Sequence, residues 1–600
     1  MRTTQSILEM VHARGTKGLT LERVYRLLYT KDLYLTAYGK LYANDGALTV
    51  GVDEQDTMQG MNLEQIDQII EQLKTGTYQW QPVRRVNIPK QNGKTRPIGI
   101  LVWSDKLLQE TIRMVLESYY DPQFSTHSHG YRSQRGCHTA LQEIGRWHGM
   151  TWFIEADLEK CFDKIDHTLL LTVIGRKIKD QRLLKLLKEW LQAGYMENWH
   201  YHKTYSGTPQ GAGLSPLMAN IILNELDEFM ENELIPQYTK GDVKRWNPEY
   251  RRIQNNIAYA KRKGRVERYQ ALCKQRRLLP TKDTHDPDFR RLKYTRYADD
   301  VLLGFIGPYA EATEVKEKIA QFLQTIKLTL SAEKTLITHA KTERARFLGY
   351  DIHIAQDNNQ LKGDKQNKQP KQRSINGRPI FNVPPEVTKA WCKRHTKDGA
   401  ITHRPALLAC SDYEITKTYG MELQGLVNYY QFAHDVSRLY KVKYHMMTSL
   451  VMTIANKHKQ STTWVYRKYK QLSEDGVTAI IVEIPNPNNP DKPLKAQLGN
   501  KPIRRKPTAI LTDEIVQLHR GRNELVNRLL ANKCELCGST EKIRVHHVHK
   551  LKDIRNKYRG RSEPPQWAKF MMERHRKTVV VCHDCHISIH SGKYDGQKVE

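Results

Sequence analysis

The first part of the chain alternates two kinds of hydrophobic pattern. From residue 1 to about 350, segments with apolar residues at helical spacing alternate with short β-rich runs, such as WFIEADL at 152–158 and VLLGFIG at 301–307. This alternation is typical of an α/β fold. A stretch rich in Lys and Arg, with little apolar content, interrupts it from about residue 238 to 291. We expect a helical or extended insertion there.

The pattern changes after about residue 360 and predicts further domains. Residues 360–379 have the low hydrophobicity of a linker. Long helical segments with repeated aromatic residues follow over 415–470, and a break rich in Pro and Asn, EIPNPNNPDKP, lies at 483–493. At 600 residues the chain is too long for one hydrophobic core, so we expect several domains.

The charge of the chain adds a candidate partner. Its 96 Lys and Arg residues outnumber 65 Asp and Glu by 31, and they are spread along the whole length. Such a surface attracts nucleic acid through its phosphates, although a merely solvated basic surface is the alternative. No stretch approaches the roughly 20 apolar residues of a membrane span, and the first residues lack a secretory apolar core. We therefore expect no membrane partner and a cytoplasmic location.

Two segments carry acidic residues in a pattern that suits metal-assisted phosphoryl transfer. Asp157 follows the apolar run WFIEA and would end a strand, while Asp299 and Asp300 lie between Tyr297 and another apolar run, as in a β-hairpin with acids at its turn. Transfer to a growing 3′ end requires carboxylates from two elements to hold two cations about 4 Å apart. An Asp-Asp pair alone is more often an ordinary turn, so the context of these segments decides.

The cysteines indicate a metal site near the C-terminus. Five are scattered singly and are expected to be inert thiols: Cys137, Cys161, Cys273, Cys392 and Cys410. The other four form two Cys-x-x-Cys pairs, the usual arrangement of structural zinc: Cys534, Cys537, Cys582 and Cys585. The strings VHHVHKL and CHISIH add histidines, and the spacing of His586 and His590 places both on one face of a helix.

Seven segments together resemble a known family. In order they are VNIPKQNGKTRPIGIL (86–101), SHGYRSQRGCHTAL (128–141), FIEADLEKCFDKIDH (153–167), GTPQGAGLSPLMANIILNELD (207–227), RYADD (296–300), LSAEKT (330–335) and FLGY (347–350). They resemble the motifs of reverse transcriptases, specifically of group II intron-encoded maturase reverse transcriptases, and they follow the order of that family. The chance that segments of this length arise together in this order by accident is negligible.

The resemblance implies a multidomain α/β and α fold. It comprises right-hand-like reverse transcriptase fingers and palm, an α-helical thumb or maturase domain, a basic DNA-binding segment, and a small zinc-containing ββα-metal (HNH) nuclease. The expected domains are an N-terminal extension and start of the fingers at 1–80, fingers and palm at 81–360, a linker at 361–380, the thumb and maturase domain X at 381–480, the DNA-binding segment at 481–530 and the HNH endonuclease at 531–600.

The resemblance also implies roles for residues at the polymerase site. Two Mg²⁺ ions are expected at the catalytic Asp157 and Asp299, with Asp300 in support and the backbone carbonyl of Leu158 as a further ligand. The substrate-binding residues are expected to be Lys94 and Arg96 for the triphosphate, Phe162 for the sugar, Gln210 and Gly211 for the template and new base pair, and Lys334 as proton donor to pyrophosphate. Plain surface charge is the alternative for Lys94 and Arg96, and a core position for Phe162.

For the nuclease, the resemblance implies that His547 is the general base. It further implies that one divalent ion is held by His546, His586 and His590. Lys577 stands where the family has an asparagine that orients the loop carrying the base, which puts the efficiency of cleavage in doubt. The alternative is a zinc ribbon that only binds DNA.

The function implied is that of an intron-encoded protein with intron RNA, target DNA and dNTPs as partners. It would promote splicing and reverse splicing, nick DNA and copy the intron from the nick. RNA contacts are expected from the extension at 43–70 and from Tyr429, Tyr430, His434, Lys457, His458 and Lys459, although aromatic residues at helical spacing are more often core. A stand-alone reverse transcriptase and an RNA-binding splicing factor with a vestigial polymerase are the alternatives.

Overall fold

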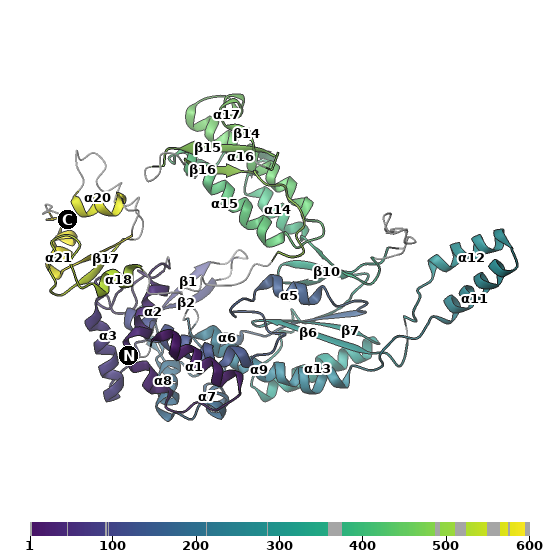
Figure 1. Cartoon of the computed structure of the whole chain (residues 1–600), viewed down its shortest axis with the longest axis horizontal. Helices are drawn as coiled ribbons and strands as arrows, with labels where there is room; N and C mark the ends of the chain where they lie inside the picture. Colours follow the sequence, from purple (N-terminus) through teal and green to yellow (C-terminus); the bar gives the residue numbers. More distant parts are fainter. Residues whose placement is uncertain are drawn as a thin grey trace.

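The computed structural model describes most of the chain. The described residues are 3–44, 46–89, 93, 95–209, 211, 213–284, 286–357, 375–473, 475–486, 493–509, 524–548, 565–573 and 577–594. Lys94, Gln210 and most of the expected linker lie outside them. In Figure 1 a mixed α/β body carries a helical unit above it, a small unit at one end and a projecting helical arm at the other.

The centre of the body is a four-stranded antiparallel sheet in the order β6-β7-β3-β8. Its strands are Arg291–Tyr297 (β6), Asp300–Ile306 (β7), Trp152–Asp157 (β3) and Leu336–His339 (β8). Successive side chains enter different cores, since Leu303 and Phe305 belong to one apolar cluster and Leu302 to the other. The expected strand ending at Asp157 and the expected acid-bearing hairpin are both confirmed.

Helices cover both faces of this sheet (Figure 1). Below it lie α9 (Ser215–Phe229), which continues through η3 (Met230–Leu234) into α10 (Ile235–Gln237), and α13 (Tyr309–Thr325). Above it lies α5 (Cys137–Ile144). The double cover explains why every residue of β7 after the first is buried.

The N-terminal part forms a helical layer beside a second sheet. The helices are α1 (Thr4–Thr16), η1 (Val24–Tyr29), α2 (Lys31–Leu41), α3 (Leu63–Thr75), α4 (Trp103–Tyr120), α7 (His167–Lys177) and α8 (Gln181–Gln192). The sheet has the order β2-β1-β4-β5, from Thr95–Ile100, Val83–Pro89, Tyr195–Glu197 and His200–His202. Arg96 thus lies in the hairpin formed by β1 and β2.

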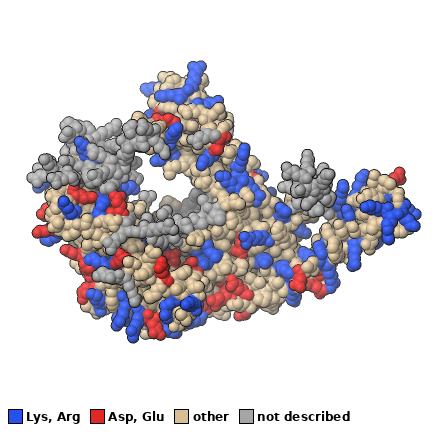
Figure 2. Space-filling model, viewed as in Figure 1, with Lys and Arg blue, Asp and Glu red and all other residues tan. Residues whose placement is uncertain are grey.

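The expected insertion is a helical hairpin. Helices α11 (Pro248–Arg262) and α12 (Val266–Leu278) project from the body as an arm, on which Figure 2 shows many Lys and Arg side chains. Helix α12 has no buried residue, so the arm has too little apolar contact with the body to lie flat on it.

The helical unit above the body contains the long helices expected over 415–470. They are α14 (Pro385–Lys393), α15 (Asp412–Tyr430), α16 (Leu439–His458) and α17 (Thr462–Tyr469). Two small sheets adjoin them, one from Ala345–Phe347 (β9), Tyr350–Ile354 (β10) and Pro379–Asn382 (β11), the other from Lys470–Leu472 (β14), Thr478–Ile484 (β15) and Leu494–Leu498 (β16). The boundary expected at 480 falls inside β15, and the domain limits stay predictions.

The small unit at the C-terminal end has a ββα core. Antiparallel strands β17 (Arg544–His547) and β18 (Thr578–Val581) precede helix α21 (His583–Ser591), and α18 (Glu524–Leu530) and α20 (Gln566–Glu573) pack beside them. Its apolar core is continuous with that of the N-terminal helices, so the unit is packed onto the body (Figure 1). None of the described helices combines the length and apolar character needed to cross a bilayer.

Candidate active sites

The three aspartates expected at the polymerase site meet at one end of the central sheet. Asp157 and Asp300 are register partners on β3 and β7, and Asp299 lies in the two-residue turn before β7, where Ala298 has φ +55°. The backbone N–H of Leu158 donates to the carbonyl of Asp299 at 3.4 Å, which joins the turn to the end of β3. Pairing of β3 with β7 thus places Asp157 beside Asp300, and the hairpin turn between β6 and β7 adds Asp299.

The electrostatics of this cluster favour a bound cation. Burial, followed by the charges of Asp299 and Asp157, raises the pKa of Asp300 to about 7. Burial also raises the pKa of Asp299. A divalent ion would relieve this repulsion between buried carboxylates, so the donor set fits such an ion. Their oxygen atoms are not gathered as tightly as the two clusters of the small C-terminal unit, however, where all candidate ligand atoms within a cluster lie within 4.8 Å.

Two of the basic side chains expected at the polymerase site lie at the edge of the carboxylate cluster. Lys334 Nζ contacts Asp157 Oδ2 at 2.8 Å, although the lysine side chain is 66% exposed, and this hydrogen bond raises the pKa of Lys334. Arg96 on β2 is close enough to Asp299 to lower the pKa of that carboxyl, against the larger effect of burial. Positive charge therefore reaches the cluster from two separate elements.

Phe162 and Gly211, both expected at the polymerase site, make close contacts within the body, and Phe162 packs against the main apolar core. Phe162, in α6 (Cys161–Lys164), contacts the ring of Tyr131 edge to face at 6.4 Å, and its carbonyl accepts from Thr208 N–H at 2.7 Å. Gly211 has φ +97°, and a Cβ there would lie 2.7 Å from the Ile98 side chain on β2. Glycine is needed at this position because of both its conformation and its contact with the hairpin.

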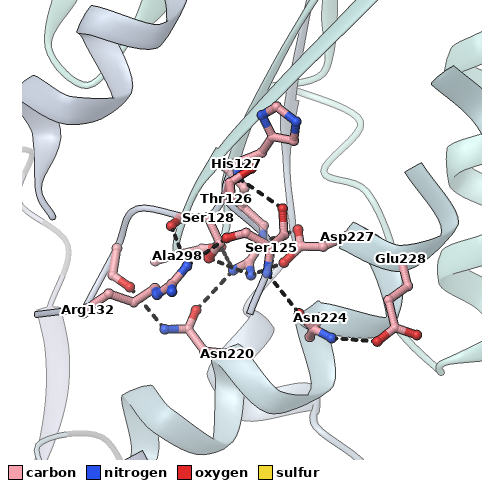
Figure 3. Close-up of polar contacts among 12 residues, drawn as sticks. Ser125, Thr126, His127, Ser128, Arg132, Asn220, Asn224, Asp227, Glu228 and Ala298 are labelled. Carbon is pink, nitrogen blue, oxygen red and sulfur yellow. Dashed lines mark hydrogen bonds and ion pairs between the residues drawn. The ribbon is translucent and has the colours of Figure 1, made fainter. Parts of the chain in front are cut away.

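A buried arginine that was not singled out from the sequence is hydrogen-bonded to the acidic turn. Arg296 on β6 is fully buried and forms an ion pair with the fully buried Asp227 of α9 at 2.5 Å. Figure 3 labels its partners Ser128, Asn220, Asp227 and Ala298. Arg296 also donates to the carbonyl of Ala298 at 2.9 Å, to Asn220 at 3.0 Å and to Ser128 at 2.9 Å. The network therefore links β6, α9 and the loop before α5 to the turn that carries Asp299.

The small C-terminal unit gathers two separate sets of metal-ligating side chains. One is Cys534, Cys537, Cys582 and Cys585, and the other is His546, His586 and His590. Backbone N–H groups of Cys537 and Cys585 point at the sulfurs of Cys534 and Cys582, at 3.4 and 3.5 Å. Four thiols in two such turns fit a tetrahedral zinc ion, and three imidazoles that leave further positions open fit a second ion.

His547, the expected general base, is buried beside these ligands. It is 7% exposed, and burial lowers the pKa of its imidazole to about 3. Its Nε2 atom lies 3.1 Å from the hydroxyl of Tyr38 on α2. Lys577, which replaces the expected asparagine, is exposed, and its backbone carbonyl accepts from Val548 N–H at 3.0 Å. This bond joins the ends of β17 and β18 without a side chain.

The structure adds two residues that no sequence pattern indicated. Gln59, in the loop before α3, places its amide nitrogen 2.7, 3.2 and 2.9 Å from ring nitrogens of His546, His586 and His590. Tyr38 is the partner of His547 described above. Both come from the N-terminal helical layer, 487 to 531 residues before the histidines that they contact.

Several residues expected to bind RNA form hydrogen bonds or ion pairs within the protein. The hydroxyl groups of Tyr429 and Tyr430 donate to the carbonyls of Leu348 and Gly349, at 2.8 and 3.1 Å. His434 Nδ1 accepts from the backbone N–H of Phe381 at 3.1 Å. Lys457 and His458 both contact Asp412, at 2.6 and 2.8 Å, and Lys459 ends α16 with φ +51°. The two tyrosines therefore fit the alternative that aromatic residues at helical spacing belong to the core.

Three family models match the chain in succession. They are Reverse transcriptase (RNA-dependent DNA polymerase) at residues 88–352, Type II intron maturase at 386–488, and AI2M/AI1M-like HNH endonuclease at 534–586. Together with the acid-bearing hairpin and the Cys/His unit, they define the class of the chain as a reverse transcriptase that also carries maturase and HNH nuclease domains.

Relatives give the particular family. The chain is 38% identical to the group II intron-encoded protein LtrA of Lactococcus lactis subsp. cremoris, over 98% of this chain and 99% of the relative. It is 34% identical to the putative COX1/OXI3 intron 1 protein of Saccharomyces cerevisiae, over 94% of this chain and 68% of the relative. The chain belongs to the group II intron-encoded proteins, with reverse transcriptase, maturase and HNH endonuclease functions.

Proposed function

We propose that this protein binds its intron RNA, promotes splicing and reverse splicing, nicks target DNA and copies the intron from the nick. The observation that carries the copying step is the register pairing of Asp157 on β3 with Asp300 on β7, with Asp299 in the turn between β6 and β7. The body would provide the fingers and palm, and the helical unit above it the thumb and domain X. The work would be done in the cytoplasm.

At the polymerase site, Asp157, Asp299 and Asp300, with the Leu158 carbonyl, would hold two Mg²⁺ ions. When bound, the ions would lower the charge of the triphosphate and favour ionisation of the primer hydroxyl. Arg96 and Lys94 would orient the incoming dNTP, and Lys334, protonated beside Asp157, could give its proton to the departing pyrophosphate. Phe162 would limit space at the sugar, while Gln210 and Gly211 would contact the template and new base pair.

At the nuclease site, zinc on the four cysteines would brace the unit, and His546, His586 and His590 would hold a divalent ion. His547 would accept the proton of the attacking water. Its depressed pKa keeps the ring neutral near pH 7, and a neutral imidazole can act as a base.

Primer extension on an RNA template with a DNA primer and Mg²⁺ tests the polymerase assignment. Asp299→Asn should lower the rate at least about a thousandfold, because it removes one carboxylate from the ion site, and should leave RNA affinity within a few fold. Asp398→Asn is the matched control, because Asp398 lies in a distant turn with φ +51°, a conformation that Asn also adopts. If the unmutated protein synthesises no DNA, the RNA-binding splicing factor is the better description.

Nicking of DNA that carries the insertion site, by the protein bound to its intron RNA, tests the nuclease assignment. His547→Ala should reduce nicking about a hundredfold or more and leave primer extension unchanged. His12→Ala, which changes an exposed histidine of α1, is the control. Persistent nicking by His547→Ala would remove that residue from the role of base.

A further inference from the structure

The loop before α3 is bound to the edge of the nuclease sheet. Gly60 N–H donates to the carbonyl of Val545, and Val545 N–H donates to the carbonyl of Met61, both at 3.0 Å. Met61 and Val545 thereby form an antiparallel bridge on strand β17. Met58 and Met61 are 2% and 0% exposed, so the contact is also apolar. Residues 58–61 thus cover an edge that would otherwise leave backbone groups unpaired.

The side chain of Gln59 projects from this loop into the centre of the histidine cluster. Its Nε2 atom lies within 3.2 Å of one ring nitrogen on each of His546, His586 and His590. Its Oε1 atom accepts from the backbone N–H of His547 at 2.9 Å, which fixes the orientation of the amide. An amide NH₂ only donates hydrogen bonds, and it has no lone pair available for a cation. Gln59 in this position and an ion on the three histidines therefore exclude each other.

The same N-terminal layer also covers the expected base. Tyr38, which is 0% exposed, has its hydroxyl 3.1 Å from Nε2 of His547, and His547 itself is 7% exposed. His546 and His586 are 5% and 8% exposed. In this arrangement neither the base nor two of the three candidate ligands is open to a DNA strand.

We propose that residues 58–61 are an inhibitory cover of the nuclease and that Gln59 holds the position of its divalent ion. The inference rests on the proposed function of the three histidines as an ion site. The ion binds only when the Gln59 side chain leaves the cluster, so the apparent affinity for the ion is reduced by the fraction of molecules in which the site is covered. The free protein is therefore protected from cleaving DNA until the cover is displaced.

Binding of Mn²⁺ to the full chain, followed through the electron paramagnetic resonance signal of free Mn²⁺, tests this proposal. The quantity measured is the Mn²⁺ binding that His590→Ala removes. This difference separates binding at the histidines from binding at the polymerase site. Gln59→Ala should strengthen that part about tenfold, because the competing amide is gone. Gln55→Ala is the matched control, since Gln55 is an exposed glutamine of the same loop and should leave binding unchanged. Nicking of a supercoiled plasmid should rise in parallel.

Unchanged or weaker Mn²⁺ binding by Gln59→Ala would contradict the proposal that residues 58–61 cover the ion site. Weaker binding would instead make the Gln59 carbonyl a ligand after rotation of the amide. If His590→Ala, combined with Gln59→Ala, removes no Mn²⁺ binding, the histidines are not an ion site and the proposed nuclease function fails as well. Primer extension and thermal unfolding should match the unmutated protein. If Gln59→Ala does not fold, Gln59→Ser provides the same test with a small polar side chain.

Discussion

The polymerase and nuclease sites of this chain differ in what assembles them and what covers them. The acids of the polymerase site lie on two paired strands, and charged side chains approach them from the exposed edge. The histidines of the nuclease site are already gathered within 4.8 Å, but a loop from the other end of the chain fills their centre. One site therefore presents mutually repelling acids to incoming cations, whereas the other binds its ion only when a side chain leaves.

This difference indicates where control of each activity resides. Repulsion among Asp157, Asp299 and Asp300 makes the polymerase cluster respond to its ions, so substrate and metal can complete it together. The nuclease depends on whether its packing against the N-terminal layer is released at Gln59. Four substitutions test this difference between the two sites, and the largest effect is expected at the zinc ligands.

Loss of zinc should abolish nicking and spare DNA synthesis. Cys582 caps helix α21, which carries His586 and His590, and structural zinc contributes on the order of 10 kcal/mol to the folding of small domains. Cys582→Ser should therefore lower the zinc content measured by elemental analysis and reduce nicking to below about 1%, with primer extension within about twofold. Cys273→Ser on the projecting arm is the control. Full nicking without zinc would show that packing on the body alone maintains the unit.

The next largest effect is expected at the buried ion pair beneath the polymerase turn. Arg296→Met leaves Asp227 charged and fully buried, which should destabilise the body by roughly 3–5 kcal/mol and reduce primer extension. Chemical denaturation measures the first and a primer assay the second. Arg296→Met combined with Asp227→Leu should recover part of the stability, because no charge is then left unpaired.

The ion pair of Arg176 with Glu225 provides the matched control for this substitution. It has a similar length, 2.6 Å, but the arginine side chain is 55% exposed, so Arg176→Met should cost no more than about 1 kcal/mol. Equal losses from the two substitutions would mean that burial is not what makes the Arg296 pair important.

How well the sequence predicts each site depends on how far apart along the chain its residues lie. Asp299 and Asp300 were predictable because an apolar run, VLLGFIG, follows them directly, and His586 and His590 because four residues make one helical turn. Arg296 carried no distinct signal, because its strand β6 also contains Arg291 and Lys293, and its partner Asp227 lies 69 residues earlier. Gln59 carried none, since it belongs to no periodic element and its contact with His546 spans 487 residues. Only tertiary packing brings such residues together.

A smaller effect is expected at the contact between the Gly211 loop and the β1–β2 hairpin. Gly211→Ala places a methyl group 2.7 Å from the Ile98 side chain, at a residue whose φ is +97°. The loop must therefore shift, which should cost roughly 1–3 kcal/mol of stability. Steady-state primer extension should show a raised KM for dNTP, with nicking unchanged. Gly425→Ala in α15, where a Cβ meets nothing within 4 Å, should be neutral or slightly stabilising. An unchanged KM would separate this loop from the substrate.

The smallest effect is expected at His434, which is partly buried outside both sites and needs no metal. Burial, then the charge of Arg505, lowers its pKa from 6.5 to about 4, and its Nδ1 atom must stay unprotonated to accept from Phe381 N–H. Between pH 6.5 and 4 the unfolded state binds the proton more readily, so this histidine reduces stability as the pH falls through that window. Asp435 and His353 are the other titratable groups near the ring.

Urea unfolding of His434→Gln at pH 7 and pH 5 measures this contribution. The variant should lose less stability on acidification than the unmutated protein, by on the order of 1 kcal/mol because the ring is only partly shielded from solvent. His12→Gln, at an exposed position, should match the unmutated protein. An identical acid loss in His434→Gln would show that other groups with a pKa lowered by burial, such as His129 and His395, carry the acid sensitivity instead.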